Sequence, residues 1–401
     1  MRTEIGTLIV ATSIVQLGNG FFGTFFSLRV AGRDFAPLVA GLVLSSYFAG
    51  FTVSAMRCGR IIERVGHIRA YAAFAGLVAA ATAAMPLWVG ALPWLILRGI
   101  IGFGCAGLFV TTESWLNAKA AAAERGRVFS IYMVGTFVAL AVGQLLIGQV
   151  RIDSDAAFNA IVALFAVALV LVSATSAEAP RVIAAATLPY GQLPRAAPVA
   201  VAGCALSGLI TSSFYALIPA WMQGEDIAQT TIALFMLIAV LGGLAFQIPV
   251  GRLSDSFDRR LVLTGLGLGF GATAIAVVLL PHTRQVVLPL AALLGGFMSA
   301  LYPVCVAHAH DRMPQDRVVA VSGQLILISG IGSVIGPLIG ASVMAVAGID
   351  GVLYFMAAAA LALALMAAVG SVRTAAPRPL ERTFEVLAPQ AASLAHDPVG
   401  S

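Results

Sequence analysis

The sequence predicts an all-α integral membrane protein with twelve transmembrane helices arranged as two six-helix bundles. Three observations lead to this prediction: an apolar composition, a series of charge-free segments long enough to cross a membrane, and an internal repeat. Of the 401 residues, 60% are hydrophobic and only 10% are charged, and the mean hydropathy is +0.98. In a soluble globular domain about a quarter of the residues are charged. This amount of apolar surface therefore requires lipid rather than water as its solvent.

Charge-free segments of membrane-spanning length follow one another along the chain. A helix of roughly 20 residues crosses the hydrocarbon core of a bilayer. One long apolar segment is divided into two spans, because Pro86, Gly90 and Pro93 favour a tight reversal within it. The expected spans are Ile5–Leu28, Leu38–Met56, 70–88, 92–117, Val128–Val150, Ala156–Ala177, Ala196–Gly224, Ile227–Gly251, Leu261–Thr283, Gln285–Ala309, Val318–Ile349 and Gly351–Val372.

The basic residues fix the expected direction of these spans. Of the 23 lysines and arginines, all but Arg29, Arg33, Arg98, Arg151 and Arg284 fall on the side of the N terminus. The positive-inside rule then places both termini in the cytoplasm. The net charge of +5 is spread along the chain rather than clustered, so no nucleic-acid partner is expected.

The expected domain organisation follows from the spans and from one segment of linker character. Residues 1–175 form the first six-helix bundle, and residues 199–373 form the second. Between them, residues 176–198 hold four prolines and two arginines and are predicted to be a cytoplasmic linker. Residues 374–401 are rich in Pro and Ala and are predicted to be a disordered cytoplasmic tail.

An internal repeat relates the two predicted bundles. The segment Gly59-Arg-Ile-Ile-Glu-Arg-Val-Gly-His-Ile-Arg69 follows the second span, and Gly251-Arg-Leu-Ser-Asp-Ser-Phe-Asp-Arg-Arg260 follows the eighth, at an offset of 192. Two further matches lie at offsets of 190 and 193, Arg127-Val128 with Arg317-Val318 and Gly143-Gln-Leu with Gly336-Pro-Leu. Three matches in one order indicate a duplicated six-span unit whose interface would hold a solute path.

These motifs resemble the major facilitator superfamily of secondary transporters. The Gly, carboxylate and Arg cluster of both repeated segments is similar to the loop signature of that family. The stretch 98–104 resembles its Arg-bearing signature in span 4, and 332–340 resembles a Gly-Pro signature best known in span 5 of antiporters. Span 5 here has Gly143-Gln144 where that proline would stand, which departs from the drug/proton antiporter branch. Thr111–Asn117, with its Glu-Ser-Trp-Leu-Asn sequence, resembles a poorly characterised bacterial subgroup.

The resemblance implies that spans 1, 4, 7 and 10 line a central cavity, so polar and aromatic residues on those spans are candidate substrate-binding groups. Buried amides need hydrogen-bond partners in lipid, and another helix could equally satisfy them. For Arg98, solute binding and support of helix packing both remain open. The predicted substrate-binding residues are Gln16, Asn19, Phe22, Arg98, Thr211, Tyr215 and Tyr302.

The repeated loop segments predict a gate. A carboxylate such as Glu63 or Asp255 can accept hydrogen bonds from a helix N-terminus and can pair with nearby arginines, which would latch helix ends in one conformation. Glu113 near the end of span 4 could join this latch by pairing with a loop arginine such as Arg64, or could carry a proton; we favour the latch. The predicted gating residues are Gly59, Glu63, Arg64, Arg69, Glu113, Gly251, Asp255, Arg259 and Arg260.

Two histidines, His308 and His310, lie near the cytoplasmic end of span 10 and are interpreted as hydrated interface residues. Walker A, HExxH and GxSxG motifs are absent from the sequence, so an enzyme, a cofactor and a metal site are not expected.

The predicted function is secondary active transport of a small organic solute by alternating access, coupled to protons, by a monomer in a bacterial inner membrane. A multidrug or metabolite efflux antiporter is the alternative within the same class. A passive channel or a membrane sensor that binds solute without moving it is the alternative of another class.

Overall fold

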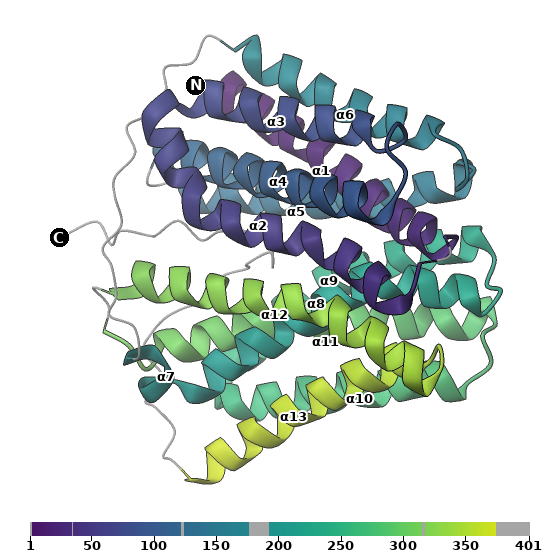
Figure 1. Ribbon diagram of the computed structural model, residues 1–401. Helices are drawn as coiled ribbons and strands as arrows, with labels where there is room; N and C mark the ends of the chain where they lie inside the picture. Colours follow the sequence, from purple (N-terminus) through teal and green to yellow (C-terminus); the bar gives the residue numbers. More distant parts are fainter. Residues whose placement is uncertain (1, 34, 122–123, 176–191, 315–316, 374–401) are drawn as a thin grey trace.

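The computed structural model describes residues 2–33, 35–121, 124–175, 192–314 and 317–373, and the regular elements in these ranges are helical (Figure 1). The elements are α1 (Arg2–Ala31), α2 (Pro37–Val65), α3 (His67–Ala84), α4 (Ala91–Lys119), α5 (Arg125–Leu145), the 3₁₀ helix η1 (Leu146–Gln149), α6 (Ala156–Ser173), α7 (Gln192–Ala196), α8 (Pro198–Gly224), α9 (Gln229–Ser256), α10 (Arg259–Leu279), α11 (Arg284–His310), α12 (Val318–Ala347) and α13 (Gly351–Arg373). The predicted tail and most of the predicted linker lie outside the described residues, and the end of that linker forms α7.

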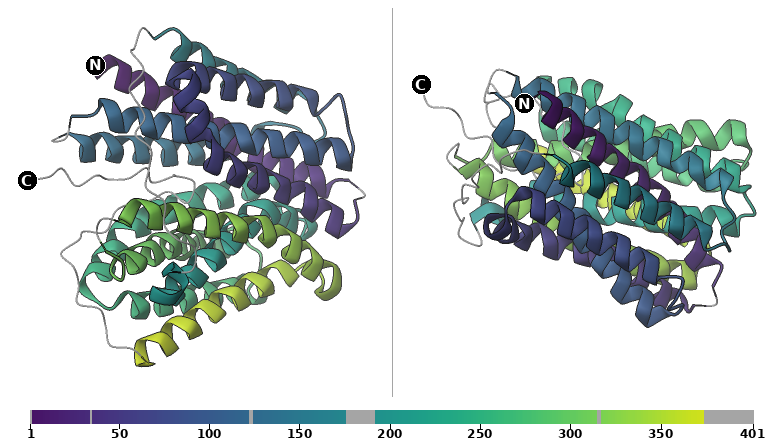
Figure 2. Two further views of the ribbon diagram at one scale, coloured as in Figure 1. Left: turned by 60° about the vertical axis from the view of Figure 1, so that its left-hand side comes forward. Right: turned by 90° about the horizontal axis from the view of Figure 1, so that it is seen from above.

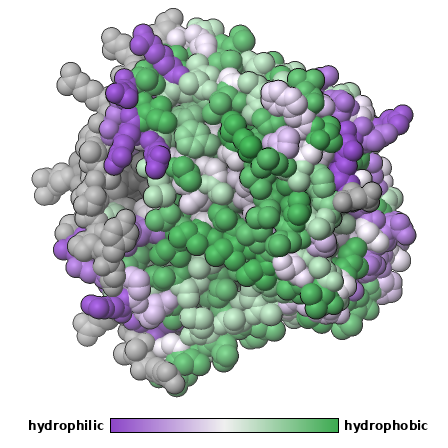
Figure 3. All heavy atoms as spheres, viewed as in Figure 1, coloured by the Kyte–Doolittle hydropathy of each residue, from purple (hydrophilic) through white to green (hydrophobic). Residues whose placement is uncertain are grey.

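The long helices are suited to a membrane. Eleven helices of the described residues are long and apolar enough to cross a bilayer. The remaining long helix, α3, carries His67 and Arg69 in its first turn, which lower its hydropathy. Figure 3 shows the resulting surface, an apolar band between two hydrophilic ends. The protein is therefore a multi-pass membrane protein.

Helix boundaries follow local chemistry, with one correction to the predicted loops. The reversal expected near Pro86 is confirmed, because α3 ends at Ala84 and α4 begins at Ala91. The segment from Gly59 onward was expected to be a loop, and this is wrong. It continues α2 to Val65, and the chain turns only at Gly66, whose φ of 82° favours glycine. The second copy, from Gly251, likewise belongs to the last turns of α9.

The helices form two groups, α1–α6 and α8–α13, which lie one above the other in Figure 1 and in the left view of Figure 2. In the first group α2 packs on α4, α1 on α5, and α3 on α4 and α6. In the second group α9 packs on α11, α8 on α12, and α10 on α13. The groups meet along α2 with α12, α5 with α9, and α1 with α8. The larger buried hydrophobic cluster contains residues of both groups.

The close crossing of α2 and α4 depends on two glycines. A Cβ added to Gly102 would lie 2.7 Å from the carbonyl carbon of Tyr47, and closer still to the carbonyl oxygen. A Cβ added to Gly50 would lie 2.7 Å from the carbonyl carbon of Gly99. The two backbones are therefore in contact, as small residues permit in membrane helix pairs.

The same crossing recurs in the second group, between α9 and α11. A Cβ at Gly295 would meet the carbonyl carbon of Ala239 at 2.5 Å, and one at Gly242 would meet that of Ala292 at 2.8 Å. These four residues lie 192 or 193 positions after their counterparts in the α2 and α4 crossing. The offset found in the loop motifs thus also relates backbone contacts.

Candidate functional site

A chain of polar side chains joins α1 to α2. The Tyr47 hydroxyl donates to Asn19 Oδ1 at 3.0 Å, and Asn19 Nδ2 donates to Gln16 Oε1 at 3.3 Å. Gln16 is buried, and Asn19 is partly buried. One turn further along the same face of α1, a Cβ at Gly23 would meet nothing within 4 Å, so open space lies beside this chain. The amides thus have hydrogen-bond partners, and α1 is not tightly packed one turn away, at Gly23.

Arg98 on α4 lies among aromatic rings from two other helices. Its guanidinium carbon is 4.9 Å from the ring centre of Phe22, 4.6 Å from that of Phe26 and 4.7 Å from that of Tyr47. Arg98 is 6% exposed, its Nε has no hydrogen-bond partner, and no carboxylate pairs with it among the described residues. Cation–π contacts orient the group and stabilise it partly. They leave its positive charge without a counter-ion at membrane depth, which is costly and is typical of functional groups.

The structure therefore joins the predicted residues Gln16, Asn19, Phe22 and Arg98 into one site. It also adds Tyr47 and Phe26, which the sequence analysis did not select. The sequence offers one signal for Tyr47, which is a lone tyrosine within its predicted span.

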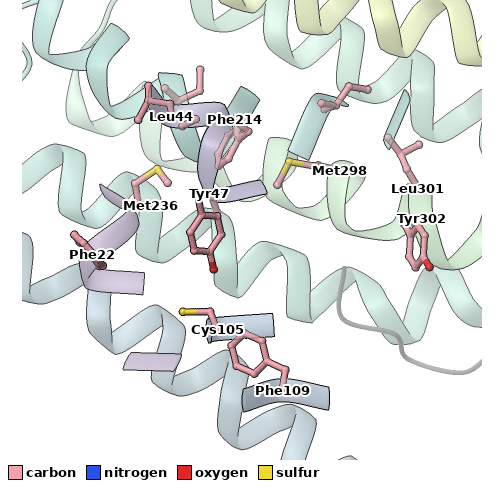
Figure 4. Packing of buried hydrophobic residues seen from close by; sticks show 14 of the residues in the cluster. Phe22, Leu44, Tyr47, Cys105, Phe109, Phe214, Met236, Met298, Leu301 and Tyr302 are labelled. Atoms are coloured by element: carbon pink, nitrogen blue, oxygen red, sulfur yellow. The ribbon is translucent and has the colours of Figure 1, made fainter. Parts of the chain in front are cut away.

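The predicted residues of the second group do not touch this site. Thr211 and Tyr215 share one partly buried face of α8, where Tyr215 packs against Phe137 and its neighbours on α5. Tyr302 on α11 is buried, and Figure 4 places it apart from Phe22 and Tyr47. In this conformation the polar groups of the two halves are thus separate.

Glu113 lies within the first group rather than at its surface. It is 4% exposed, and the Tyr132 hydroxyl donates to its Oε1 at 3.2 Å. The expected partner Arg64 is exposed and does not pair with it. Thr112, next to Glu113, is hydrogen bonded to Thr12 of α1 at 2.9 Å. Glu113 is thus a buried carboxyl group that accepts a hydrogen bond from a neutral hydroxyl and has no contact with Arg64 in this conformation.

The charged residues predicted to gate in the first copy of the loop motif form no ion pairs within the described residues. These residues, Glu63, Arg64 and Arg69, are exposed. A Cβ at Gly59 would meet nothing within 4 Å. The α2–α3 end is held instead by His67, whose Nε2 is hydrogen bonded to the Ser114 hydroxyl at 3.0 Å.

The second copy is engaged and ties α10 to α11. Arg259 Nε donates to Asp311 Oδ2 at 2.6 Å, and Arg259 Nη2 lies 3.6 Å from Asp255 Oδ1. Arg259 Nη1 also donates to the Ser254 hydroxyl at 2.9 Å. Arg259 and Asp311 are each 8% exposed, so this ion pair is shielded from water. The predicted pairing of Asp255 with Arg259 is present, and Asp311 is an addition.

Arg260 ties the same turn to α13. It donates to Asp258 Oδ2 at 2.6 Å through Nη2, and to the carbonyl oxygen of Gly370 at 2.6 Å through Nη1. Asp258 also accepts from the backbone N–H of Arg260, as an N-cap of α10. Hydrogen bonding from Arg260 lowers the pKa of the Asp258 carboxyl below its usual value.

The hydrogen bonds described between the two groups lie toward the end opposite the predicted cytoplasmic one. The Ser27 hydroxyl of α1 donates to the carbonyl oxygen of Ala216 at 2.6 Å. Gln229 at the start of α9 donates to the carbonyl oxygen of Val150 at 2.7 Å. Figure 1 shows α2 and α12 converging at this same end, where a Cβ at Gly41 would meet Ala341 at 3.0 Å. The two groups are thus closed against each other at one end of the molecule.

Known proteins share both the sequence pattern and the fold. The family model of the Major Facilitator Superfamily matches residues 8–244 and again residues 200–396. An uncharacterized MFS-type transporter, YcaD of Escherichia fergusonii, is 30% identical over 332 residues, which cover 82% of this chain and 86% of that protein. YcaD of Shigella flexneri is 28% identical, over 84% of this chain and 88% of that protein.

Two solved structures show the same fold at low sequence identity. The nucleoside transporter NupG superposes with a TM-score of 0.74 at 11% identity, over 91% of this chain and 98% of that one. A bacterial homologue of the human lysosomal transporter Spinster, in an inward-facing and occupied conformation, superposes with a TM-score of 0.71 at 16% identity, over 92% and 97%. The relatives are transporters and not enzymes, and the chain belongs to the major facilitator superfamily.

Proposed function

We propose that this protein is a secondary active transporter that moves a small organic anion across a bacterial inner membrane by alternating access. In this proposal twelve spans form two pseudo-symmetric six-helix bundles, the protein acts as a monomer, and both termini are cytoplasmic. The observation that carries the proposal is the buried guanidinium of Arg98. It has three aromatic faces around it and an amide and hydroxyl chain beside it, and it has no carboxylate partner in the part of the chain that the structure describes. A solute carboxylate or similar anion would supply the missing counter-charge.

The repeated helix crossings support two pseudo-symmetric bundles. Equivalent glycines make equivalent backbone contacts in both groups, which is expected when a six-span unit is duplicated. The interface between such units is the usual place of a midplane binding site.

The distribution of contacts between the groups supports alternation. The groups are bonded together toward the end opposite the predicted cytoplasmic one, while Glu63 and Arg64 at the predicted cytoplasmic end are exposed. This corresponds to an inward-facing state. In the outward-facing state the cytoplasmic ends would approach each other, and the exposed first copy of the motif would then gain partners. A permanently open pore would not need charges that pair in only one of two conformations.

Glu113 is the proposed coupling group. It is an acidic side chain inside a membrane-spanning helix, buried and hydrogen bonded by the Tyr132 hydroxyl of α5. Ionisable groups at this depth are costly and are typical of ion and proton pathways. Proton movement and helix movement would then be linked through the same residue.

The experiment begins with a ligand. The purified protein is screened by thermal shift against organic anions and their uncharged analogues, because a ligand of the folded state raises its apparent stability. Hits are then tested for uptake in proteoliposomes with and without a pH gradient. Arg98→Gln should show no thermal shift with the anion, and its uptake should be at least ~10-fold slower. The reason is that removing the charged partner of the anion weakens binding by about 1.4 kcal/mol or more. Arg57→Gln, an exposed arginine on α2, is the matched control.

The outcomes separate the alternatives. Saturable uptake that responds to a counter-gradient supports the transporter, and Glu113→Gln should abolish its dependence on pH while exchange persists. Uptake that neither saturates nor responds to a counter-gradient would indicate a channel. Ligand binding without flux would indicate a sensor. Normal anion uptake by Arg98→Gln would remove Arg98 from the binding site and refute the proposed solute class.

A further inference from the structure

A second candidate site lies away from the Arg98 region, at the predicted cytoplasmic end of the second group. A cavity of about 470 Å³ opens there between α7, α8, α10, α11 and α13. Ligand pockets usually measure about 300–1,000 Å³, so the space is sufficient for a small polar headgroup. Neither the solute site nor the proton site described above contributes to it.

One wall of the cavity is basic. It contains Arg195, Arg260, Arg312 and His308. Asp258 pairs with Arg260 and offsets one of these charges. Burial together with the charge of Arg260 lowers the pKa of Arg312, which indicates that positive groups are crowded. The wall therefore keeps an excess of positive charge.

Two polar atoms in this wall lack partners. His308 is 2% exposed, and its Nδ1 has no hydrogen bond within the described residues, so its expected position at a hydrated interface is wrong. The Nε of Arg312 is also buried without a hydrogen bond. Leaving such groups unpaired costs roughly 1–3 kcal/mol each, which a bound ligand would relieve. Moreover, α8 begins at the cavity with Pro198, and no side chain caps its first amides.

The other wall is apolar and faces outward. Leu365, Met366 and Val369 on α13 line the cavity, and they are 66%, 41% and 39% exposed. Because α13 is one of the membrane-length helices, its exposed apolar face contacts lipid. A ligand in this cavity would thus meet positive charge on one side and hydrocarbon on the other.

We propose that this cavity binds the phosphate of an anionic phospholipid from the leaflet on the predicted cytoplasmic side. The phosphate would lie between Arg195 and Arg312 and accept a hydrogen bond from the His308 ring, and an acyl chain would follow the apolar face of α13. Basic pockets between helix ends at this side of a membrane are suited to acidic headgroups. A soluble anion would use the basic wall but would gain nothing from the apolar one.

Native mass spectrometry of the full-length protein in detergent tests the proposal. Phosphatidylglycerol is titrated as the anionic probe, and phosphatidylcholine with the same acyl chains is the zwitterionic comparison. Each positive charge near a membrane surface changes affinity by about five-fold, so Arg195→Gln/Arg312→Gln should weaken phosphatidylglycerol binding by about 25-fold. The charge-preserving Arg195→Lys/Arg312→Lys should retain most of the binding. Arg252→Gln, an exposed arginine of the same group outside the cavity, is the control and should bind as the wild type does.

Several results would overturn the assignment. Equal binding of the two lipids by the wild type would show that headgroup charge is not recognised. Unchanged phosphatidylglycerol binding by the glutamine pair, or an equal loss in the lysine pair, would exclude the basic wall as the binding surface. A thermal shift with inorganic phosphate as large as that with phosphatidylglycerol would identify a soluble anion rather than a lipid as the ligand. Size-exclusion chromatography and circular dichroism confirm that each variant is folded before it is compared.

Discussion

The crossing of α2 and α4 provides a prediction whose size follows from the structure. In Gly102→Ala, the new Cβ would lie 2.7 Å from the Tyr47 carbonyl carbon and even nearer to its oxygen. Both atoms belong to helix backbone, so no side chain can rotate away, and the two helices must separate. Overpacking typically costs 1–3 kcal/mol, and we expect about 3 kcal/mol because rigid backbone must move. At roughly 2 °C per kcal/mol for a large chain, the apparent Tm should fall by about 6 °C.

The assay is thermal unfolding of the purified protein in one detergent, followed by tryptophan fluorescence and size-exclusion chromatography. Gly76→Ala on α3 is the matched control, because a Cβ at that position meets nothing within 4 Å. This control should be neutral or slightly stabilising, since alanine favours helix. Gly295 on α11 is the counterpart of Gly102, so Gly295→Ala should lower the apparent Tm as much as Gly102→Ala does. If the apparent Tm of Gly102→Ala equals that of Gly76→Ala, the backbone contact does not exist in the protein. The repeat of helix crossings then loses its support.

Two further predictions concern the engaged copy of the motif. Asp311→Asn leaves the buried Arg259 with the more distant Asp255 as its carboxylate partner, and should lower the free energy of unfolding by about 3 kcal/mol in the same thermal assay; an unchanged Tm would mean that the ion pair is not formed. Because Arg260 lowers the pKa of the Asp258 carboxyl, this group stabilises the fold above its unfolded pKa and loses that effect as the pH falls through its folded pKa. Asp258→Asn should therefore cost about 1.5 kcal/mol at neutral pH and progressively less below about pH 4, and a difference that does not depend on pH would contradict the charge interaction.

The helices and the repeat could be predicted from the sequence because their causes are local or periodic. Apolar segments of membrane length identify spans whatever their neighbours are. The reversal near Pro86 is encoded by prolines and a glycine in a short stretch. The predicted spans end earlier than α2 and α9 do, because a span boundary was predicted at each charged residue. A helix can extend beyond the hydrocarbon core into water, so a charge marks the end of the apolar segment and not of the helix.

The candidate site was predictable only in part, for a different reason. Gln16, Asn19 and Arg98 were selected because polar groups at membrane depth are unusual in a single span. Their connection depends on Tyr47, which comes from another helix and reaches Asn19 only through the crossing of α2 with α4. Tertiary contacts of this kind leave no periodic signal in the sequence. The same is true of Glu113, whose hydrogen bond from Tyr132 of α5 joins two helices and has no counterpart in the sequence pattern.

The two copies of the loop motif differ in a way that bears on how the gate would work. His67 stands where the second copy has Arg259, 192 positions later. A histidine bonded to a hydroxyl gives the first copy a neutral anchor, whereas Arg259 uses its charge on Asp311 within its own half. The carboxylate and arginine of the first copy, Glu63 and Arg64, are therefore left for partners outside their half, while the charges of the second copy already brace α10 against α11. In the proposed gate between the halves, one set of charges must be uncommitted, and His67 in place of an arginine would leave Glu63 and Arg64 of the first half available.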